Sequence, residues 1–390
     1  MLQKFAVVSN ILPPSPSGQS TMLYKLLEGI PVTDYCLISG RQYNTTETHP
    51  DFPPKLPARY YWLKSVPRLY GLDRWGLWVF RKLYNFLPTF LWQTLQIATI
   101  IKKEKCKAII SCTGDVFDMP ASYLASRLTR TSLYAYIFDY YLYQWLDPML
   151  NNFMGKIEPI IIKGAKKVIV TNEFMYDEYY KHYGIASTII RNPCDTSYNI
   201  SKIVPLFGEI RIVYTGAVYV AHYDAFLNLI EAINILDRSD IKLHIYSASN
   251  TTEMEQVGIR GPVEFHPHLG LNQIAQAQRD ADILFLPLAF KSPYPFLIRT
   301  SAPGKMGEYL MSGRPILVHA PGDSFLSWYF RKNQCGLVVD QNSPKLLADG
   351  ITRLMDSPEL LSSLVTRAIE QGKVDFDINL ARVKFLSIFE

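Results

Sequence analysis

The sequence predicts an α/β fold built from two doubly wound domains, each with a parallel sheet between layers of helices. The chain has 390 residues, which is too long for one ordinary domain and suits two of about 200. Apolar residues make up 48% and charged residues 19%, the balance of a folded globular protein rather than a disordered one. Short apolar runs alternate with helical patterns in both halves, which is typical of parallel sheets with helices on both faces.

The first domain is predicted to span residues 1–195. Its expected strands are the apolar runs at 5–8, 35–39, 108–112, 133–138, 168–171 and 188–191. The opening apolar run is too short for a signal peptide and is interpreted as a first buried strand. A helix is expected to begin near Ser20, after the turn that contains Gly18.

A polar stretch at 196–208 is predicted to link this domain to a second one at 209–372. The expected strands of the second domain lie at 210–215, 243–246, 263–266 and 283–288, and its first helices at 225–236 and 272–279. The tail has a helical pattern, and its last part, 373–390, is a candidate to cross back to the first domain.

The cysteines favour a cytoplasmic protein. They are odd in number, scattered and without a C-x-x-C pair, namely Cys36, Cys106, Cys112, Cys194 and Cys335. This usage is typical of reduced thiols.

Cations and aromatic residues gather between residues 59 and 107. The cations there are Arg59, Lys64, Arg68, Arg74, Arg81, Lys82, Lys102, Lys103, Lys105 and Lys107. Such a mixture is typical of a nucleic-acid-binding or a membrane-binding surface. The interleaved Trp, Tyr and Phe show no RNA-binding signature, so we favour an anionic membrane surface and expect no nucleic acid. The alternative is that these are ordinary core aromatics surrounded by solvated charges.

Within this region, residues 83–101 carry no charge over 19 residues, which is near the length of a membrane span. Polar residues interrupt the run, and Leu87, Leu91, Leu95 and Ala98 recur at helical spacing on one side. The pattern therefore favours a half-buried amphipathic helix over a membrane-spanning one.

The most informative stretch runs from 283 to 319. An apolar strand is followed by a Pro-rich loop, a small-residue turn (SAPGK), a helix with Lys305 and Glu308, a stop at Gly313 and another apolar strand. A helix start behind such a turn offers free N–H groups and a positive dipole end to a phosphate, and Lys305 adds a charge. Glu308, an acceptor when ionised, suits ribose hydroxyls.

This pattern resembles the nucleotide site of retaining glycosyltransferases with the GT-B fold, family GT4 in particular. The stretches at 165–195, 210–236, 263–287 and 336–340 are similar to other parts of that family in the same order. The resemblance implies two Rossmann-like domains that face each other across a cleft. It also implies a nucleotide-sugar co-substrate, UDP- or GDP-linked, with no other cofactor, and a glycan or lipid-linked acceptor.

The resemblance also implies a set of donor-binding residues. They are Gly18, Gly216, His222, His268, Arg299, Thr300, Ser301, Lys305 and Glu308. Lys305 and Glu308 are further expected to act in catalysis. Thr300 stands where the family commonly has a first Glu, and His222 stands where it has a basic residue after the Gly of the second domain. Arg299 is a candidate for the missing cation.

The two glycines have a shared expected role, the close approach of backbone to the donor phosphates. For Gly18 the alternative is a plain turn before a helix with Ser20 as its N-cap. Asp115 and Asp139 follow predicted strands of the first domain, at the edge where ligands bind in open α/β sheets, so either could activate the acceptor hydroxyl. A helix cap or a loop position is the alternative for each.

No metal site is predicted. His266 and His268 form an H-x-H pair on one face of a strand end, but no third ligand follows at a characteristic spacing. There is no clear D-x-D motif either, which fits transfer in which protein groups neutralise the leaving diphosphate.

Three functions remain open at this point. The first is a retaining glycosyltransferase in surface-glycan assembly, peripheral on the cytoplasmic membrane face. The second is a GT-B nucleotide-sugar epimerase, and the third is a degenerate nucleotide-sugar-binding partner without transferase activity. Incubation with a panel of nucleotide sugars would separate them.

Overall fold

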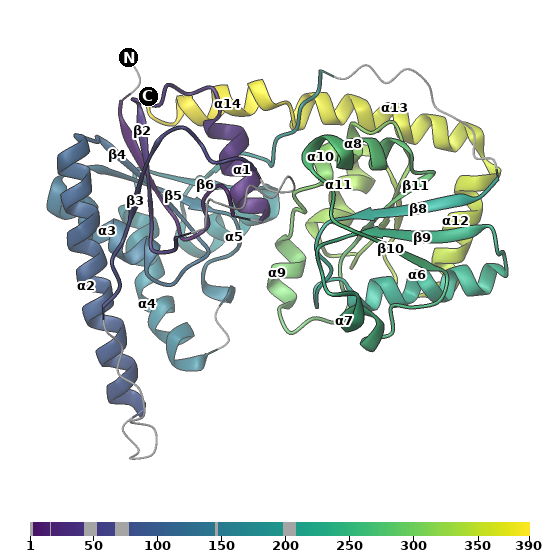
Figure 1. The fold of residues 1–390 in the computed structure, drawn as a ribbon, viewed down its shortest axis with the longest axis horizontal. Coiled ribbons are helices and arrows are strands. Elements are labelled where there is room, and N and C mark those ends of the chain that lie inside the picture. The colour runs from purple at the N-terminus through teal and green to yellow at the C-terminus, as the bar shows by residue number, and fades with distance from the viewer. Residues whose placement is uncertain (1–2, 16, 43–52, 67–77, 145–146, 198–207) are drawn as a thin grey trace. The chain divides into compact units, whose positions relative to one another are not determined.

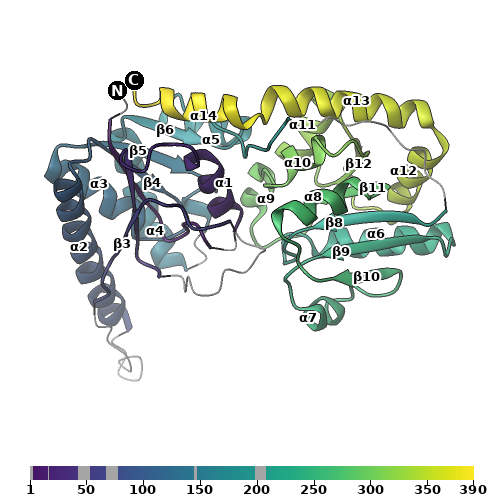
Figure 2. The ribbon, with the colours of Figure 1, turned by 45° about the horizontal axis from the view of Figure 1, so that its top comes forward.

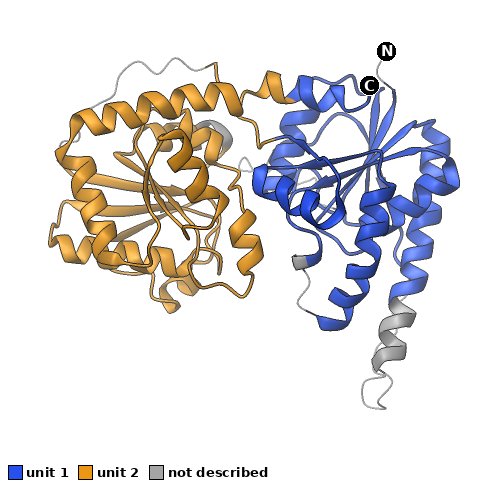
Figure 3. Ribbon diagram, turned by 180° about the vertical axis from the view of Figure 1, so that it is seen from behind, with its two compact units in different colours: residues 1–48, 53–190, 382–390 blue, residues 49–52, 191–381 orange. Residues whose placement is uncertain are grey.

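The computed structural model shows two α/β units, coloured separately in Figure 3. The structure describes residues 3–15, 17–42, 53–66, 78–144, 147–197 and 208–390. Among these, the first unit comprises the residues up to Ile190 together with Arg382–Glu390, and the second comprises Arg191–Ala381. The predicted boundary at 195 falls a few residues into the second unit, and most of the predicted linker lies outside the described residues.

The first unit is built on a parallel sheet with strand order β3-β2-β1-β4-β5-β6-β7 (Figure 1). Its strands are β1 (Phe5–Val8), β2 (Tyr35–Ser39), β3 (Arg59–Trp62), β4 (Ala108–Cys112), β5 (Ser132–Ile137), β6 (Lys167–Val170) and β7 (Thr188–Ile189). The central strands are completely buried, which explains why they appear as unbroken apolar runs in the sequence. The β3 strand was not predicted, because its exposed and half-buried residues carry no apolar run.

Helices cover this sheet on both faces. They are α1 (Gly18–Leu27), α2 (Trp78–Glu104), α3 (Asp118–Thr129), η2 (Leu142–Gln144), α4 (Pro148–Gly164), α5 (Glu173–Tyr183) and α14 (Ile378–Ser387). The last residues of α14 and the chain end join this unit. There Phe389 stacks on Phe5 and Phe385 meets the Phe5 ring edge-on. Arg382 donates to the Lys25 carbonyl and to Glu28.

The second unit has a parallel sheet of order β10-β9-β8-β11-β12-β13, with β10 at its edge (Figure 2). Its strands are β8 (Ile210–Thr215), β9 (Ile241–Tyr246), β10 (Val263–His266), β11 (Ile283–Pro287), β12 (Ile316–His319) and β13 (Leu337–Val339). Its helices are α6 (Tyr223–Leu236), α7 (Thr251–Gln256), α8 (Leu271–Arg279), α9 (Pro295–Thr300), α10 (Met306–Leu310), α11 (Phe325–Asn333), α12 (Pro344–Asp356) and α13 (Pro358–Asp375).

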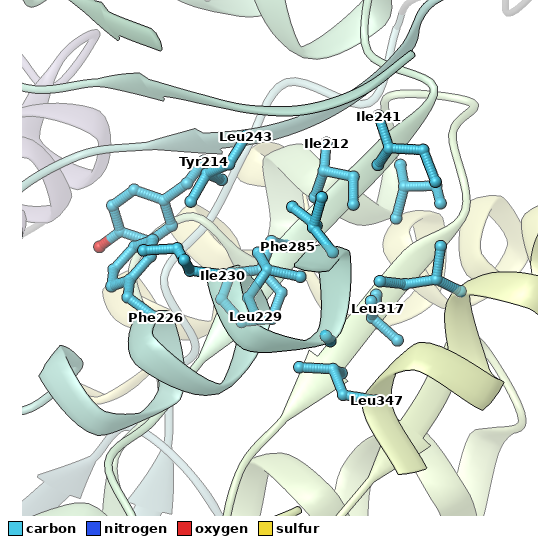
Figure 4. Packing of buried hydrophobic residues seen from close by; sticks show 14 of the residues in the cluster. Ile212, Tyr214, Phe226, Leu229, Ile230, Ile241, Leu243, Phe285, Leu317 and Leu347 are labelled. Carbon is cyan, nitrogen blue, oxygen red and sulfur yellow. The ribbon is translucent and has the colours of Figure 1, made fainter. Parts of the chain in front are cut away.

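The core of this unit lies between one face of the sheet and helices α6 and α12 (Figure 4). Phe226 and Leu229 of α6 pack against Ile212 and Phe285 of the sheet, and Leu347 of α12 closes the cluster. Burial of a large apolar side chain of this kind stabilises the fold by about 1.5–3 kcal/mol. The predicted α/β class, with two doubly wound parallel-sheet domains, is confirmed.

The side of α2 that carries the predicted spacing is buried only at Ala98. Leu87, Leu91 and Leu95 are each about half exposed, whereas Ile97 and Ile101 are fully buried. Helix α2 packs against the neighbouring α3. The leucine stripe therefore faces outward. No helix among the described residues is both long and apolar enough to cross a membrane.

Part of the basic and aromatic region is structural. The buried carboxylate of Glu104 accepts hydrogen bonds from Lys4, Tyr61 and Arg59. Burial alone would raise the pKa of Glu104, but these three donors lower it to about 2. Tyr60 stacks on Trp62, and its hydroxyl donates to the Pro13 carbonyl. The β3 residues therefore make contacts within the fold, whereas Arg68 and Arg74 lie outside the described residues.

Candidate functional site

The candidate site begins at Gly216, where β8 ends at the carboxyl edge of the second sheet. Gly216 has a φ of +120°, a backbone conformation that side chains with a Cβ rarely adopt. A Cβ at this position would lie 2.9 Å from the Nζ of Lys305. The N–H of Gly216 donates to the Tyr246 carbonyl, so this glycine offers close approach rather than a free donor.

Lys305 is the centre of a cluster formed with Gly216, Tyr214 and His222, the Lys305 cluster. Its Nζ lies 3.6 Å from the ring centroid of Tyr214, a close cation–π contact. Burial lowers the pKa of Lys305 to about 7, although the charge of Glu308 acts in the opposite direction.

Hydrogen bonds hold the end of β8 in place beneath this amine. The hydroxyl of Tyr214 donates to the Ala217 carbonyl, and the hydroxyl of Tyr309 accepts from the Thr215 N–H at 3.0 Å. Gln278 donates to the Thr215 hydroxyl. All four side chains are buried, so the Lys305 cluster rests on a rigid base.

His222 completes the cluster from the residue before α6. It is buried, its ring contacts Tyr214, Tyr219 and Phe226, and its Nδ1 has no hydrogen-bond partner. Burial, and then the nearby charge of Lys305, lowers the pKa of His222 to about 3. His222 is therefore neutral at pH 7 and does not supply the cation that the resemblance led us to expect after this glycine.

The helix that was expected to present its N-terminus is shorter than predicted. Helix α10 has five residues, with Lys305 at its N-cap and Glu308 in its first turn. So short a helix has a small dipole, and the positive character of the site rests on the Lys305 amine. Gly313, expected to end this helix, instead lies in the turn before β12, with a φ of +77°.

The remaining donor candidates of this unit lie on neighbouring segments. Thr300 is buried at the end of α9, and its hydroxyl donates to the Phe296 carbonyl of the same helix. Arg299 and Ser301 flank it and are half-buried. His268 follows the end of β10, two strands away from β8 in the sheet.

In the first unit, Gly18 is the first residue of α1, and the N-cap is Ser17 rather than Ser20. A Cβ at Gly18 would meet nothing within 4 Å, so the protein itself does not require glycine there. Asp115 accepts from the Phe117 N–H in the turn before α3. Asp139 is exposed just after β5.

A carboxyl group that the sequence analysis missed lies beside Asp115. Asp118 is fully buried at the start of α3, and its Oδ2 accepts the Asn10 N–H at 2.7 Å. Burial and the charge of Asp115 raise its pKa well above the usual range. The sequence signal was a second acid three residues after the first, which resembles an ordinary helix start.

The histidines pair differently from the predicted H-x-H. His266 lies beside His244 of β9, with their Nδ1 and Nε2 atoms 2.9 Å apart. Glu264 lies near both, and the ligand atoms of these three residues are within 4.8 Å of one another. One of the three residues, His244, comes from the neighbouring strand β9, so spacing along the sequence could not reveal the group.

Comparison with known proteins places this geometry in context. Residues 209–357 match the family model described as glycosyl transferases group 1. No curated protein sequence matches the chain significantly.

Solved structures match nearly the whole chain. HepE of Anabaena, in complex with UDP, has a TM-score of 0.70 and 11% identity over 98% of both chains. The sucrose-phosphate synthase of Thermosynechococcus elongatus has a TM-score of 0.70 and 16% identity over 99% of this chain and 98% of its own. A putative UDP-N-acetylglucosamine 2-epimerase of Listeria monocytogenes has a TM-score of 0.61 and 12% identity over 99% and 95%. These likenesses show the GT-B fold.

Proposed function

We propose that the protein is a retaining, GT4-like glycosyltransferase that moves a sugar from a nucleotide-sugar donor to a glycan or lipid-linked acceptor in surface polysaccharide or glycoconjugate assembly. The match of residues 209–357 to a group 1 glycosyltransferase model supports a donor site in the second unit. The UDP complex of HepE, which has the same fold, supports a nucleoside diphosphate as the ligand.

The observation that carries the proposal is the Lys305 amine, held over Tyr214 against Gly216. The family has a cation after this glycine, and in this chain that position is the neutral His222. We propose that Lys305 supplies the positive charge from a different segment, so that the departure at His222 does not abolish donor binding. A diphosphate beside the amine would replace the solvation that burial removes.

The proposed transfer does not depend on a nucleophilic side chain of the protein. As the sugar leaves, negative charge grows on the diphosphate, and a protonated Lys305 stabilises that charge where it develops. Glu308, one turn along, would accept hydrogen bonds from the ribose hydroxyls. On the acceptor side, Asp115 or Asp139 would orient or deprotonate the attacking hydroxyl.

The outward leucine stripe of α2 supports a membrane-associated acceptor. Leu87, Leu91, Trp92 and Leu95 are each more than 40% exposed, and Lys102 and Lys103 follow on the same helix. Apolar and aromatic side chains with nearby cations suit the boundary of an anionic bilayer. We propose that α2 rests on the cytoplasmic face of the cell membrane. The test is sedimentation with anionic vesicles, where Leu91→Gln/Leu95→Gln should reduce binding, and absence of binding at low salt would refute it.

The function itself is tested by incubating the full chain with UDP- and GDP-sugars, with and without lipid-linked acceptors, and analysing products by mass spectrometry. Sugar transfer or slow donor hydrolysis supports the proposal, and activity should survive EDTA. Isomerisation of the sugar without transfer would indicate the epimerase instead. Binding without any reaction would indicate the degenerate partner.

A further inference from the structure

A compact group of metal-ligating side chains lies on the ladder between β9 and β10, apart from the Lys305 cluster. His244 of β9 pairs in register with Glu264 of β10, and His266 pairs with Tyr246. Because side chains alternate along a strand, these four residues project from the same face of the sheet. That face is opposite to the one that carries Leu243 and Ile245 into the core.

The donor atoms have the spacing of ligands around one small ion. His244 Nδ1 lies 2.9 Å from His266 Nε2 and 3.5 Å from Glu264 Oε2. Ligands held about 2.0–2.2 Å from a first-row metal ion are separated from each other by roughly 3–3.5 Å. The three side chains thus need little movement to share an ion.

The surroundings hold these ligands in the required state. His244 is only 3% exposed, and its Nε2 is buried without a hydrogen-bond partner, 3.6 Å from Glu209 Oε1. A carboxylate behind a histidine is the usual outer support of a metal-bound imidazole. Lys242 holds Glu264 by its Oε1 at 2.7 Å, which leaves Oε2 directed at the imidazoles.

The charges around the group are balanced. Lys242 and Arg211 are positive, and Glu209 and Glu264 are negative. The ring of Tyr246 stacks on His266 at 4.4 Å and fixes its orientation.

We propose that His244, Glu264 and His266 form a site for a divalent transition-metal ion of the zinc type, completed by water. Two imidazoles and one carboxylate are a common ligand set for zinc, and they also accept cobalt and nickel. The ion would tie the edge strand β10 to β9. The proposal is independent of the proposed transferase activity, because none of its ligands belongs to the Lys305 cluster.

Titration of the EDTA-treated and desalted full chain with ZnCl2 by calorimetry tests the site. One ion should bind per chain, and CoCl2 should give an absorption band of a nitrogen-ligated ion. His266→Ala and Glu264→Gln should each weaken zinc binding by about 100-fold, and Glu209→Gln by about 10-fold. Zinc should also raise the Tm of the unaltered protein and leave that of His266→Ala unchanged.

His268→Ala is the matched control, because the sequence alone would pair His268 with His266. Unchanged zinc affinity in this variant supports the proposed set, and a loss equal to that of His266→Ala would overturn it. His266 and Glu264 are partly exposed, so the His266→Ala and Glu264→Gln variants should both fold and remain testable. Zinc affinity of the unaltered chain no greater than that of His266→Ala would also overturn the proposal, leaving a plain histidine–histidine hydrogen bond.

Discussion

The carboxyl edges of the two sheets carry opposite chemistry. In the second unit the edge at Gly216 carries an amine, that of Lys305, whereas in the first unit the edge beyond β4 carries the carboxyl group of Asp115, with that of Asp118 buried beneath it. Burial disfavours the charged form on both sides, since it lowers the pKa of Lys305 to about 7 and raises that of Asp118. Ionisable groups whose pKa burial shifts in this way are typical of binding sites, and under the proposed function the amine would face a diphosphate and the acidic edge an acceptor hydroxyl.

The largest expected effect is the loss of the amine. Lys305→Ala should weaken nucleoside diphosphate binding by about 1.5–3 kcal/mol, the range for a charged hydrogen bond, which is roughly 10- to 150-fold in affinity. Calorimetry measures it. Lys332→Ala is the matched control, because Lys332 also lies over an aromatic ring, that of Trp328, but is exposed. Equal affinities for both variants would remove Lys305 from the site.

The next prediction separates backbone strain from site geometry. Gly216→Ala forces a Cβ into a φ of +120° and against Lys305 Nζ, so we expect a loss of about 1–3 kcal/mol in stability and a loss of nucleotide binding. Gly184→Ala also has a positive φ, +68°, but open space around it, so it should lose about 1 kcal/mol in stability and bind nucleotide normally. Denaturant unfolding measures the stability of both variants, and calorimetry measures their affinity for the nucleotide. Normal binding by Gly216→Ala would show that the close approach is not needed.

The pH dependence of binding follows from Lys305. In the free protein its pKa is about 7, and a bound diphosphate should raise it, so binding above pH 7 takes up a proton. Affinity for a nucleotide sugar, whose own phosphates do not titrate in this range, should then fall by up to about tenfold per pH unit between pH 7 and 9. Calorimetry in buffers of different ionisation enthalpy would detect the proton uptake. A flat profile that Lys305→Ala does not alter would show that the amine is already fully charged.

The sequence predicted the fold better than the site, for a physical reason. Buried parallel strands such as β1 and β4 leave unbroken apolar runs, so the two sheets could be placed before the structure was known. The contact between Lys305 and Gly216 joins segments far apart in the chain, and only the family resemblance brought both residues into view. Asp118 was missed because its burial depends on tertiary packing. The exposure of the leucine stripe of α2 was missed because the spacing of apolar residues defines a helix face without saying whether other parts of the protein cover that face.

The smallest expected effect concerns the acidic edge. The pKa of Asp118 is higher in the folded protein than in the unfolded chain, where it is about 3.9. Asp118 therefore stabilises the fold fully below its unfolded pKa, and this stabilisation is lost as the pH rises through its folded pKa. Asp118→Asn keeps the shape and removes the charged form, so at pH 8 the variant should be more stable than the unaltered protein by about 1 kcal/mol or more, and this difference should shrink toward pH 4. Asp115→Asn, which removes the neighbouring charge, should shift stability in the same direction but less. Urea unfolding across this pH range measures both. If Asp115 orients the acceptor hydroxyl, Asp115→Asn should also transfer sugar more slowly. An Asp118→Asn variant that is destabilised at pH 8 would mean that partners in the fold already stabilise the charged carboxylate.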